Sequence, residues 1–284
     1  LIKLDPAYYA AYYNLGLLLY DDNDFAGAAE EFADCVRIKP DFAQACYNAA
    51  LCMIKLDKLP DAAAYLQNAV KIDAGYAEAY YNLGIVLFRT NNFKDAAKNF
   101  LKAASLKPKA EYYYNLGLAY AKLDENDNAI NSYKDALRLK EAYPEAYFNC
   151  GLLYMQKKDY QNALLCFEPI LKYEPDNINA IHNLGVVHSK LGNPEKAIDF
   201  YRRGLQYEPD NAELYFNIGV ACAKMEKWQD ALESYRQALD IDPKNIKVRS
   251  NIAVAYSKLG ETRKSEEEYK YILKLNPDYA EVWF

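Results

Sequence analysis

Eight asparagines recur along this chain, and their side chains suit hydrogen bonding rather than covalent chemistry. Successive members are 34 residues apart, except for one interval of 33 residues. An asparagine amide is uncharged and both donates and accepts hydrogen bonds, so a regular row of them could pair with the backbone of an extended polypeptide. The row, called here the asparagine ladder, consists of Asn14, Asn48, Asn82, Asn115, Asn149, Asn183, Asn217 and Asn251.

The side chains that most often carry catalysis or hold metals are sparse. The two histidines, His182 and His188, are six positions apart, which places them on different faces of one helix, and no cluster of cysteines or carboxylates supplies further metal ligands. The six cysteines include no Cys-x2-Cys pair, a usage that fits a reducing compartment. We therefore expect a cytoplasmic protein without catalytic activity, metal or cofactor.

The spacing of the ladder predicts an array of stacked repeats, because a fixed period of roughly 20–50 residues is the signature of such arrays. Each repeat holds two apolar segments with helical spacing around a short polar turn; in the third repeat, Tyr80, Leu83 and Leu87 begin the first helix. The full repeats cover residues 9–42, 43–76, 77–109, 110–143, 144–177, 178–211, 212–245 and 246–279. Residues 1–8 and 280–284 are partial repeats, so we expect the sequence to be part of a longer chain.

Two kinds of position predict tightly packed helix pairs. Residue types that tolerate a left-handed backbone stand in the turns of six repeats, whereas Lys158 and Glu226 stand there in the other two. The six are Asn23, Asp57, Asn91, Asp124, Gly192 and Gly260. Glycine costs ~1 kcal/mol relative to alanine inside a helix, so its recurrence predicts close approach between helices. The small residues are Gly16, Ala50, Gly84, Gly117, Gly151, Gly185, Gly219 and Ala253.

A larger side chain on each second helix is expected to fill the space between neighbouring repeats. It is aromatic in all repeats but one, and the set is Phe32, Leu66, Phe100, Tyr133, Phe167, Tyr201, Tyr235 and Tyr269.

The order of these residues resembles the tetratricopeptide repeat. In the fourth repeat it is Tyr-x2-Leu-Gly-x2-Tyr over residues 113–120, followed by Ala129 and Tyr133, with tyrosine where the family usually has tryptophan. A proline recurs near the end of most repeats, as at Pro108. The resemblance covers the whole chain and implies an all-α, right-handed superhelical α-solenoid of antiparallel helix pairs over residues 1–284. It also implies that the first helices line a concave groove.

The ladder shares its face of the first helices with three further stripes. Residues at spacing i, i+4, i+7 and i+11 lie on one side of a helix. The aromatic stripe is Tyr13, Tyr47, Tyr81, Tyr114, Phe148, His182 and Phe216, interrupted at Ser250. The aliphatic stripe is Leu17, Leu51, Ile85, Leu118, Leu152, Val186, Val220 and Val254. The basic stripe is Lys55, Arg89, Lys122, Lys190, Lys224 and Lys258, with Asp21 and Gln156 as exceptions.

This face predicts a non-catalytic protein-interaction scaffold that binds an extended peptide. Asparagine amides would pair with the peptide backbone, the apolar stripes would accept its side chains, and the lysines favour an acidic ligand. Each neutral hydrogen bond contributes only ~1 kcal/mol net, so many repeats would have to act together. The alternatives are structural: the asparagines could bridge neighbouring helices, the aliphatic stripe could pack on the next first helix, and the basic stripe could be solvated.

Two other functions stay open. An unbroken asparagine ladder resembles the substrate-recruiting arm of the O-linked N-acetylglucosamine transferase, whose catalytic domain this sequence would lack. A structural subunit of ciliary, secretion or export machinery would instead use the second helices and the array ends, through which oligomerisation could also occur. Some members of the family bind acidic chaperone tails, but the Lys and Asn places of that clamp hold aromatic and aliphatic residues here.

The net charge and the lack of long apolar stretches disfavour two classes of partner, nucleic acids and membranes. The formal net charge of −6 disfavours a nucleic-acid backbone as a ligand. No apolar stretch approaches the ~20 residues that a membrane helix needs.

Two irregularities have structural consequences. Pro169 stands inside the second helix of the fifth repeat, where it should kink or break that helix. The third repeat is one residue short after Pro108, which should alter the stacking of the third and fourth repeats.

Overall fold

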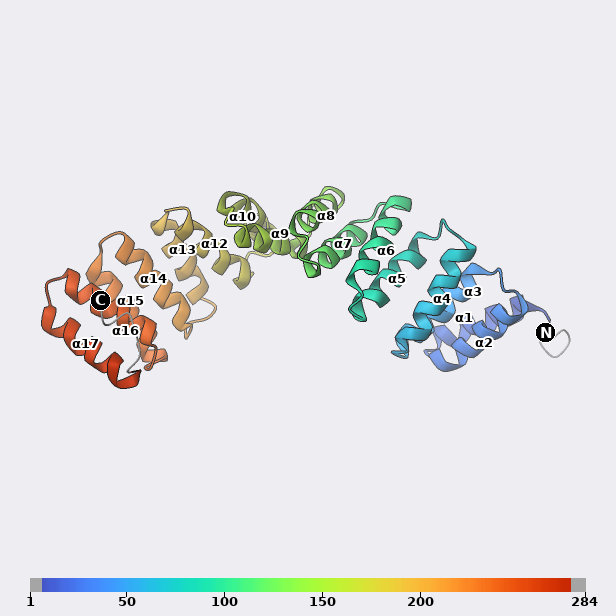
Figure 1. Cartoon of the computed structure of the whole chain (residues 1–284), viewed down its shortest axis with the longest axis horizontal. Helices are drawn as coiled ribbons and strands as arrows, with labels where there is room; N and C mark the ends of the chain where they lie inside the picture. Colours follow the sequence, from blue (N-terminus) through green and yellow to red (C-terminus); the bar gives the residue numbers. More distant parts are fainter. Residues whose placement is uncertain (1–6, 277–284) are drawn as a thin grey trace. The chain divides into compact units, whose positions relative to one another are not determined.

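The computed structural model describes residues 7–276, and this part of the chain consists of α-helices without strands (Figure 1). Its contacts divide into two compact units, residues 1–142 and 143–284, called here the N-terminal and the C-terminal unit and described separately. The N-terminal unit contains α1 (Tyr9–Asp21), α2 (Phe25–Ile38), α3 (Ala43–Lys55), α4 (Leu59–Ile72), α5 (Ala77–Arg89), α6 (Phe93–Leu106), α7 (Ala110–Lys122) and α8 (Asn126–Leu139). The C-terminal unit contains α9 (Pro144–Gln156), α10 (Tyr160–Phe167), α11 (Ile170–Tyr173), α12 (Ile178–Lys190), α13 (Pro194–Leu205), α14 (Ala212–Lys224), α15 (Trp228–Ile241), α16 (Ile246–Lys258) and α17 (Thr262–Leu275).

The predicted solenoid of helix pairs is confirmed. Within each unit, the two helices of a repeat pack on each other, as α5 does on α6, and the second helix also packs on the first helix of the next repeat, as α6 does on α7. Each repeat therefore has only its neighbours as packing partners, which is the defining property of a solenoid. The organisation of residues 1–284 as a single domain stays a prediction.

The turn between the two helices of a repeat uses the left-handed backbone region throughout. All six predicted turn residues have positive φ, from 57° at Asp57 to 78° at Gly192 and Gly260. Lys158 and Glu226, whose residue types do not favour the left-handed region, adopt the same backbone conformation. Their φ angles are 59° and 58°. The packing of the helix pair thus imposes this conformation even on side chains that disfavour it.

Close approach within a repeat is set by an aromatic ring of the second helix lying against a glycine of the first. A Cβ added to Gly84 would lie 2.6 Å from Cδ1 and from Cε1 of Phe100. The same closeness recurs for Gly16–Phe32, Gly117–Tyr133, Gly151–Phe167, Gly185–Tyr201 and Gly219–Tyr235. Phe100 also shares a core cluster with Leu116 and Ala119 of the next repeat, so it fills the space between repeats as predicted.

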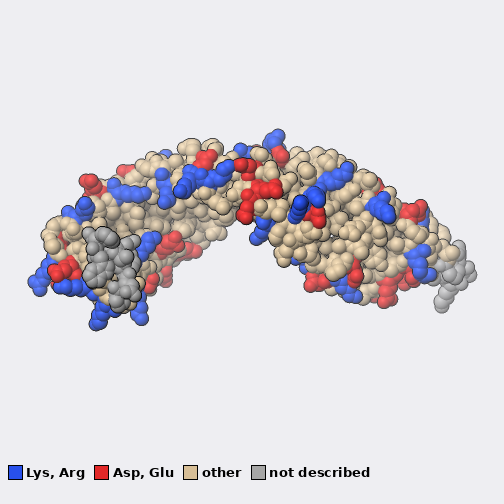
Figure 2. Space-filling model, in the orientation of Figure 1, with Lys and Arg blue, Asp and Glu red and all other residues tan. Residues whose placement is uncertain are grey.

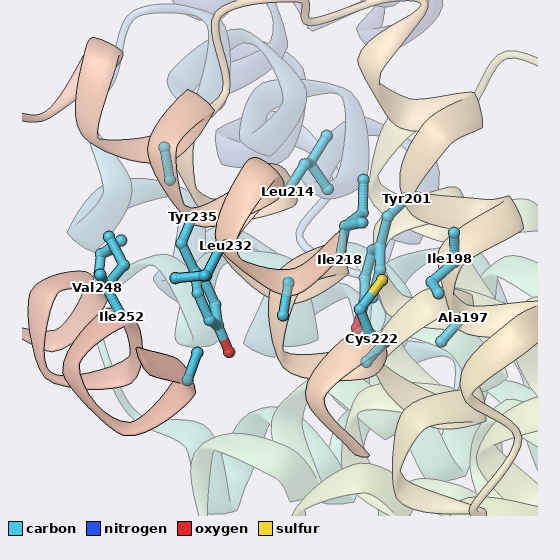
Figure 3. Packing of buried hydrophobic residues seen from close by; sticks show 14 of the residues in the cluster. Ala197, Ile198, Tyr201, Leu214, Ile218, Cys222, Leu232, Tyr235, Val248 and Ile252 are labelled. Carbon is cyan, nitrogen blue, oxygen red and sulfur yellow. The ribbon is translucent and has the colours of Figure 1, made fainter. Parts of the chain in front are cut away.

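In the last repeat this prediction is untested, because the next repeat lies outside the described residues. Tyr269 is partly buried, and Ala253 stands where most repeats have glycine. In the C-terminal unit the core otherwise runs without interruption from α13 to α16, and Figure 3 shows its side chains, among them Tyr201, Ile218 and Tyr235.

Pro169 breaks the second helix of the fifth repeat, which confirms that prediction. The segment is divided into α10, ending at Phe167, and the short α11, beginning at Ile170. Proline lacks the amide hydrogen that would continue the ladder of helical hydrogen bonds. The chain nevertheless resumes its direction well enough for Ile170 to be fully buried. The predicted effect of the short third repeat on stacking stays a prediction.

Within residues 7–276, no helix is both long enough and apolar enough to cross a bilayer.

Candidate functional site

The candidate site is the face of the first helices that carries the asparagine ladder, called here the first-helix face. Each ladder asparagine is the sixth residue of its helix, so the eight amides occupy equivalent places. Asn14 is exposed and the other seven are partly buried. Partial burial means that each amide has neighbours in the fold, and those neighbours decide how much of its hydrogen-bonding capacity a ligand could use.

In the N-terminal unit, tyrosines of the aromatic stripe bind the ladder. Nδ2 of Asn48 lies 3.1 Å from the hydroxyl oxygen of Tyr13 in the preceding repeat. Asn82 makes the same bond to Tyr47 at 2.9 Å. Here the asparagines bridge neighbouring first helices, which was the structural alternative for their role.

The amides of Asn82 and Asn115 are saturated as donors. Nδ2 of Asn115 lies 3.1 Å from the hydroxyl oxygen of Tyr81 and 2.8 Å from the backbone oxygen of Glu111. Asn82 likewise donates to the backbone oxygen of Glu78, at 3.0 Å, beside its tyrosine. An amide has two N–H bonds, so only the Oδ1 acceptor of either side chain is left for a ligand.

In the C-terminal unit, Asn183 and Asn251 have no tyrosine partner in the part of the chain that the structure describes. The aromatic stripe there holds Phe148, His182 and Phe216, and phenylalanine offers no oxygen. Nδ2 of Asn183 donates to the backbone oxygen of Asn179 and Nδ2 of Asn251 to that of Lys247, each at 2.8 Å. These are the amides' only hydrogen bonds within the described residues, so each retains one N–H and its Oδ1.

His182 and Asn217 form the third open position of the C-terminal unit. Within residues 7–276, the side chain of Asn217 has no hydrogen bond, and neither does the buried Nε2 of His182. The nearest charge to that nitrogen is a carboxylate oxygen of Glu213, 3.8 Å away. At these positions of the aromatic stripe, the N-terminal unit has tyrosine and the C-terminal unit has phenylalanine or histidine. Which asparagine each side chain can reach depends on the alignment of successive first helices.

The aromatic stripe is engaged in packing in both units. Tyr81 stacks on Tyr112 with ring centroids 4.4 Å apart. Phe216 lies 5.8 Å from Tyr235 of its own repeat. Burial of its hydroxyl raises the pKa of Tyr81 to about 12, so the phenol stays protonated at physiological pH. The proposed contact of these rings with a peptide stays a prediction.

The aliphatic stripe has a mixed environment. Val186 and Val220 pack against the core of the C-terminal unit, and packing of the stripe on the next first helix stays a prediction. Leu152 and Val254 remain 40% and 41% exposed. The exposed members provide apolar surface beside the ladder.

The basic stripe is partly used within the fold. Nη2 of Arg89 forms an ion pair with Asp57 of the preceding turn, at 2.6 Å, and Nζ of Lys224 lies 3.1 Å from the backbone oxygen of Ser189. Lys190 and Lys258 are exposed, and neither has a carboxylate within 4.0 Å in the described part of the chain. Figure 2 shows basic and acidic side chains interspersed with large neutral areas on the side that it displays.

The two histidines and the cysteines do not form a reactive site. His188 is 4% exposed, stacks on Phe200 with ring centroids 5.4 Å apart, and has a pKa lowered by burial. All six cysteines are buried and none forms a disulfide, as expected for packing positions. Residues 7–276 contain no group of three or more histidine, cysteine or carboxylate side chains that could hold a metal ion.

Family models match along the chain. Models described as tetratricopeptide repeat match residues 1–43, 77–110 and 246–279, and a model described as TPR repeat matches residues 122–158 and 221–260. The model of subunit 3 of the anaphase-promoting complex, or cyclosome, matches residues 156–238.

Solved structures of repeat proteins share the fold. YrrB, described as a TPR protein with an unusual peptide-binding site, is 26% identical with a TM-score of 0.59, and the match covers 66% of this chain and 96% of YrrB. MamA from Desulfovibrio magneticus RS-1 is 22% identical with a TM-score of 0.56, covering 60% and 97%. PilF of Pseudomonas aeruginosa is 19% identical with a TM-score of 0.56, covering 74% and 96%. A comparison with curated protein sequences gave no match.

Proposed function

Because this chain belongs to the tetratricopeptide repeat family, we propose that it is a non-catalytic scaffold that binds an extended polypeptide along its first-helix face. The fold is that of a protein-interaction scaffold, and YrrB, the most similar of the three structures described above, is a peptide-binding protein. The observation that carries the proposal is the open hydrogen-bonding capacity of Asn183, Asn217 and Asn251 in the C-terminal unit.

An open asparagine has the groups that a peptide backbone requires. One N–H and Oδ1 can pair with a C=O and an N–H of the same extended segment, irrespective of its side chains. Asn82 and Asn115 lack a free N–H, so they could only accept. We therefore assign the stronger backbone recognition to the C-terminal unit.

The charges of this face favour a peptide with acidic residues. Lys190 and Lys258 are exposed without a carboxylate partner in the described residues. Exposed charges are screened by salt, so this part of the affinity should weaken as ionic strength rises, whereas the backbone pairing should not.

The test is binding of peptides selected from a random library against residues 1–284. Replacing Asn183, Asn217 and Asn251 together by alanine removes three ladder side chains that have free hydrogen-bonding groups. Each of these side chains can make two hydrogen bonds to the peptide at ~1 kcal/mol each, so the triple variant should bind at least roughly 100-fold more weakly. Unchanged affinity in a variant with the circular dichroism spectrum of the parent would overturn the proposal.

The matched control replaces Asn82 and Asn115 by alanine, because both N–H groups of each amide are already used within the fold. These side chains bridge first helices, so the double variant should lose stability while keeping most of its peptide affinity. An equal loss of affinity from the control and the triple variant would contradict the assignment to the C-terminal unit.

A further inference from the structure

The C-terminal unit repeats one packing arrangement three times: the second helix of one repeat packs on the first helix of the next, which packs on its own second helix. The space beside these three helices is called here a groove. In the first groove, the ring of His188 on α12 stacks on Phe200 of α13. In the third groove, Nη2 of Arg236 on α15 lies 2.8 Å from the hydroxyl oxygen of Tyr256 on α16. Aromatic side chains of the protein itself thus occupy the outer two grooves.

The third groove is closed further by an ion pair. Nη1 of Arg249 lies 3.0 Å from a carboxylate oxygen of Glu268 on α17. The guanidinium of Arg249 also lies over the ring of Tyr271, 4.1 Å from its centroid.

The middle groove, between α13, α14 and α15, is open. It contains a cavity of about 410 Å³ whose lining includes Ile218, Cys222, Ser234 and Gln237. Figure 3 shows Cys222 beside Ile218 on α14. Equivalent positions of successive repeats are 34 residues apart, so Cys222 corresponds to Tyr256, Ser234 to Glu268 and Gln237 to Tyr271. Smaller side chains thus stand at three of the four places that fill the neighbouring groove; the fourth, Arg249, has Tyr215 as its counterpart, which also lines the middle groove.

We propose that this middle groove binds a tyrosine side chain presented by a partner protein. The occupant is indicated by the neighbouring groove, where Tyr256 fills the homologous space. Arg202 lines the middle groove and is the counterpart, 34 residues earlier, of Arg236. A tyrosine ring from outside would therefore meet the arginine that Tyr256 already binds one repeat later. The cavity volume lies within the ~300–1,000 Å³ typical of ligand pockets.

The rim of the groove suits a hydroxyl group rather than a plain ring. Arg202 can donate to the phenolic oxygen, and Asp230 or Glu233, which also line the cavity, can accept its hydrogen. None of the three forms an ion pair within the described residues, so this capacity is available. Leu205 and Ile218 provide apolar contact for the ring.

The lining of the groove carries one cation, Arg202, and two carboxylates, Asp230 and Glu233. Burial raises the pKa of the Cys222 thiol, Asp230 raises it further, and Arg202 and Lys227 lower it. The thiol is therefore uncharged at physiological pH and can contact the apolar edge of a tyrosine.

The probe for this site is p-cresol, which is the side chain of tyrosine without its backbone, and toluene is its control without the hydroxyl. Titration of isotopically labelled protein, followed by amide NMR, should give saturable shifts at Ile218, Cys222 and Ser234. Toluene should bind several-fold more weakly. Absence of saturable shifts, or equal binding of both probes, would overturn the proposal.

Two variants make the test specific. Cys222→Tyr reproduces Tyr256 and should abolish p-cresol binding by filling the groove. Arg202→Leu leaves the groove open and should reduce p-cresol to the affinity of toluene, whereas Arg263→Leu on exposed α17 should change nothing. Retained p-cresol preference in the Arg202 variant contradicts the proposal, even where the tyrosine variant fails to fold.

This inference is independent of peptide binding on the first-helix face. The triple replacement of Asn183, Asn217 and Asn251 should leave p-cresol binding unchanged. A failure of either proposal is therefore visible without reference to the other.

Discussion

At the scale of single residues, the contact between a glycine and an aromatic ring sets the distance between the helices of a repeat. Gly84 and Phe100 show the usual form of this contact. The second repeat uses a different pair, Ala50 with Leu66, and both side chains are fully buried in one cluster. The chain thus uses two combinations of side chains at this contact. Glycine on the first helix faces an aromatic ring, whereas the larger alanine faces the smaller leucine.

Gly84→Ala should therefore destabilise the protein, and Phe100→Leu should relieve part of the loss. The added methyl group would overlap the ring of Phe100; overpacking costs about 1–3 kcal/mol, and better helix propensity returns ~1 kcal/mol. We expect a net loss of up to about 2 kcal/mol in urea unfolding. A double-mutant cycle measures the coupling, and additive losses from the two changes would contradict this explanation.

His188 is predicted to make stability depend on pH. Burial lowers its pKa below the usual 6.5, with Lys196 lowering it further and Glu168 opposing, and its Nδ1 has no hydrogen-bond partner in the described residues. Below about pH 6.5 the unfolded chain binds the proton more readily than the folded one, so the free energy of unfolding falls as pH drops toward the folded pKa.

The measurement compares urea unfolding of the parent and of His188→Leu between about pH 8 and 5. Leucine stands at the homologous place in the third repeat, as Leu87, so the variant should fold. The parent should lose stability relative to the variant as pH falls through about 6.5, the usual pKa of a histidine side chain. Parallel curves would show that His188 does not contribute.

At the scale of elements, the turns between paired helices store strain at two positions. Lys158 and Glu226 adopt positive φ, which costs roughly 1–2 kcal/mol for a residue with a Cβ. Nothing lies within 4 Å of where a Cβ would stand at the homologous Gly192. The turn is therefore open around this position, and only the backbone conformation disfavours a side chain.

Glu226→Gly should therefore stabilise the C-terminal unit by up to ~1 kcal/mol, since glycine accepts positive φ but loses more freedom on folding. Glu226→Ala is the matched control, because it removes the same carboxylate and keeps the Cβ. Thermal unfolding should show a gain for glycine alone. An equal gain from alanine would assign the effect to the charge instead of the backbone.

A structural feature can be predicted from the sequence when a single residue type causes it. The turn at Asn23, the break at Pro169 and the small residue at Gly84 are caused by the residue itself, so each could be predicted from its type. The left-handed conformation of Lys158 and Glu226 could not, because the packing of two helices imposes it against the preference of the side chain.

At the scale of the whole molecule, the asparagine ladder has two different states. The sequence predicts its period and its face, but not that Tyr47 would bind Asn82, because that bond depends on how successive first helices are aligned. The signal lies in the position just before each asparagine, where tyrosine in the N-terminal unit gives way to Phe148 and Phe216 in the C-terminal unit. A tyrosine hydroxyl thus takes the N–H of Asn82 that its bond to the backbone oxygen of Glu78 leaves free.

That difference should be transferable between the units. Phe148→Tyr and Phe216→Tyr together place hydroxyls where they can accept from Asn183 and Asn251, as Tyr47 accepts from Asn82 at 2.9 Å. Each new hydrogen bond should add about 0.5–1.5 kcal/mol to the free energy of unfolding and remove a free N–H from the ladder. We expect the double variant to be more stable and to bind library-selected peptides about tenfold more weakly, measured by urea unfolding and by calorimetric titration. A gain in stability with unchanged affinity would mean that peptides do not use these two N–H groups, and the ladder of the C-terminal unit would then have to act through Oδ1 alone.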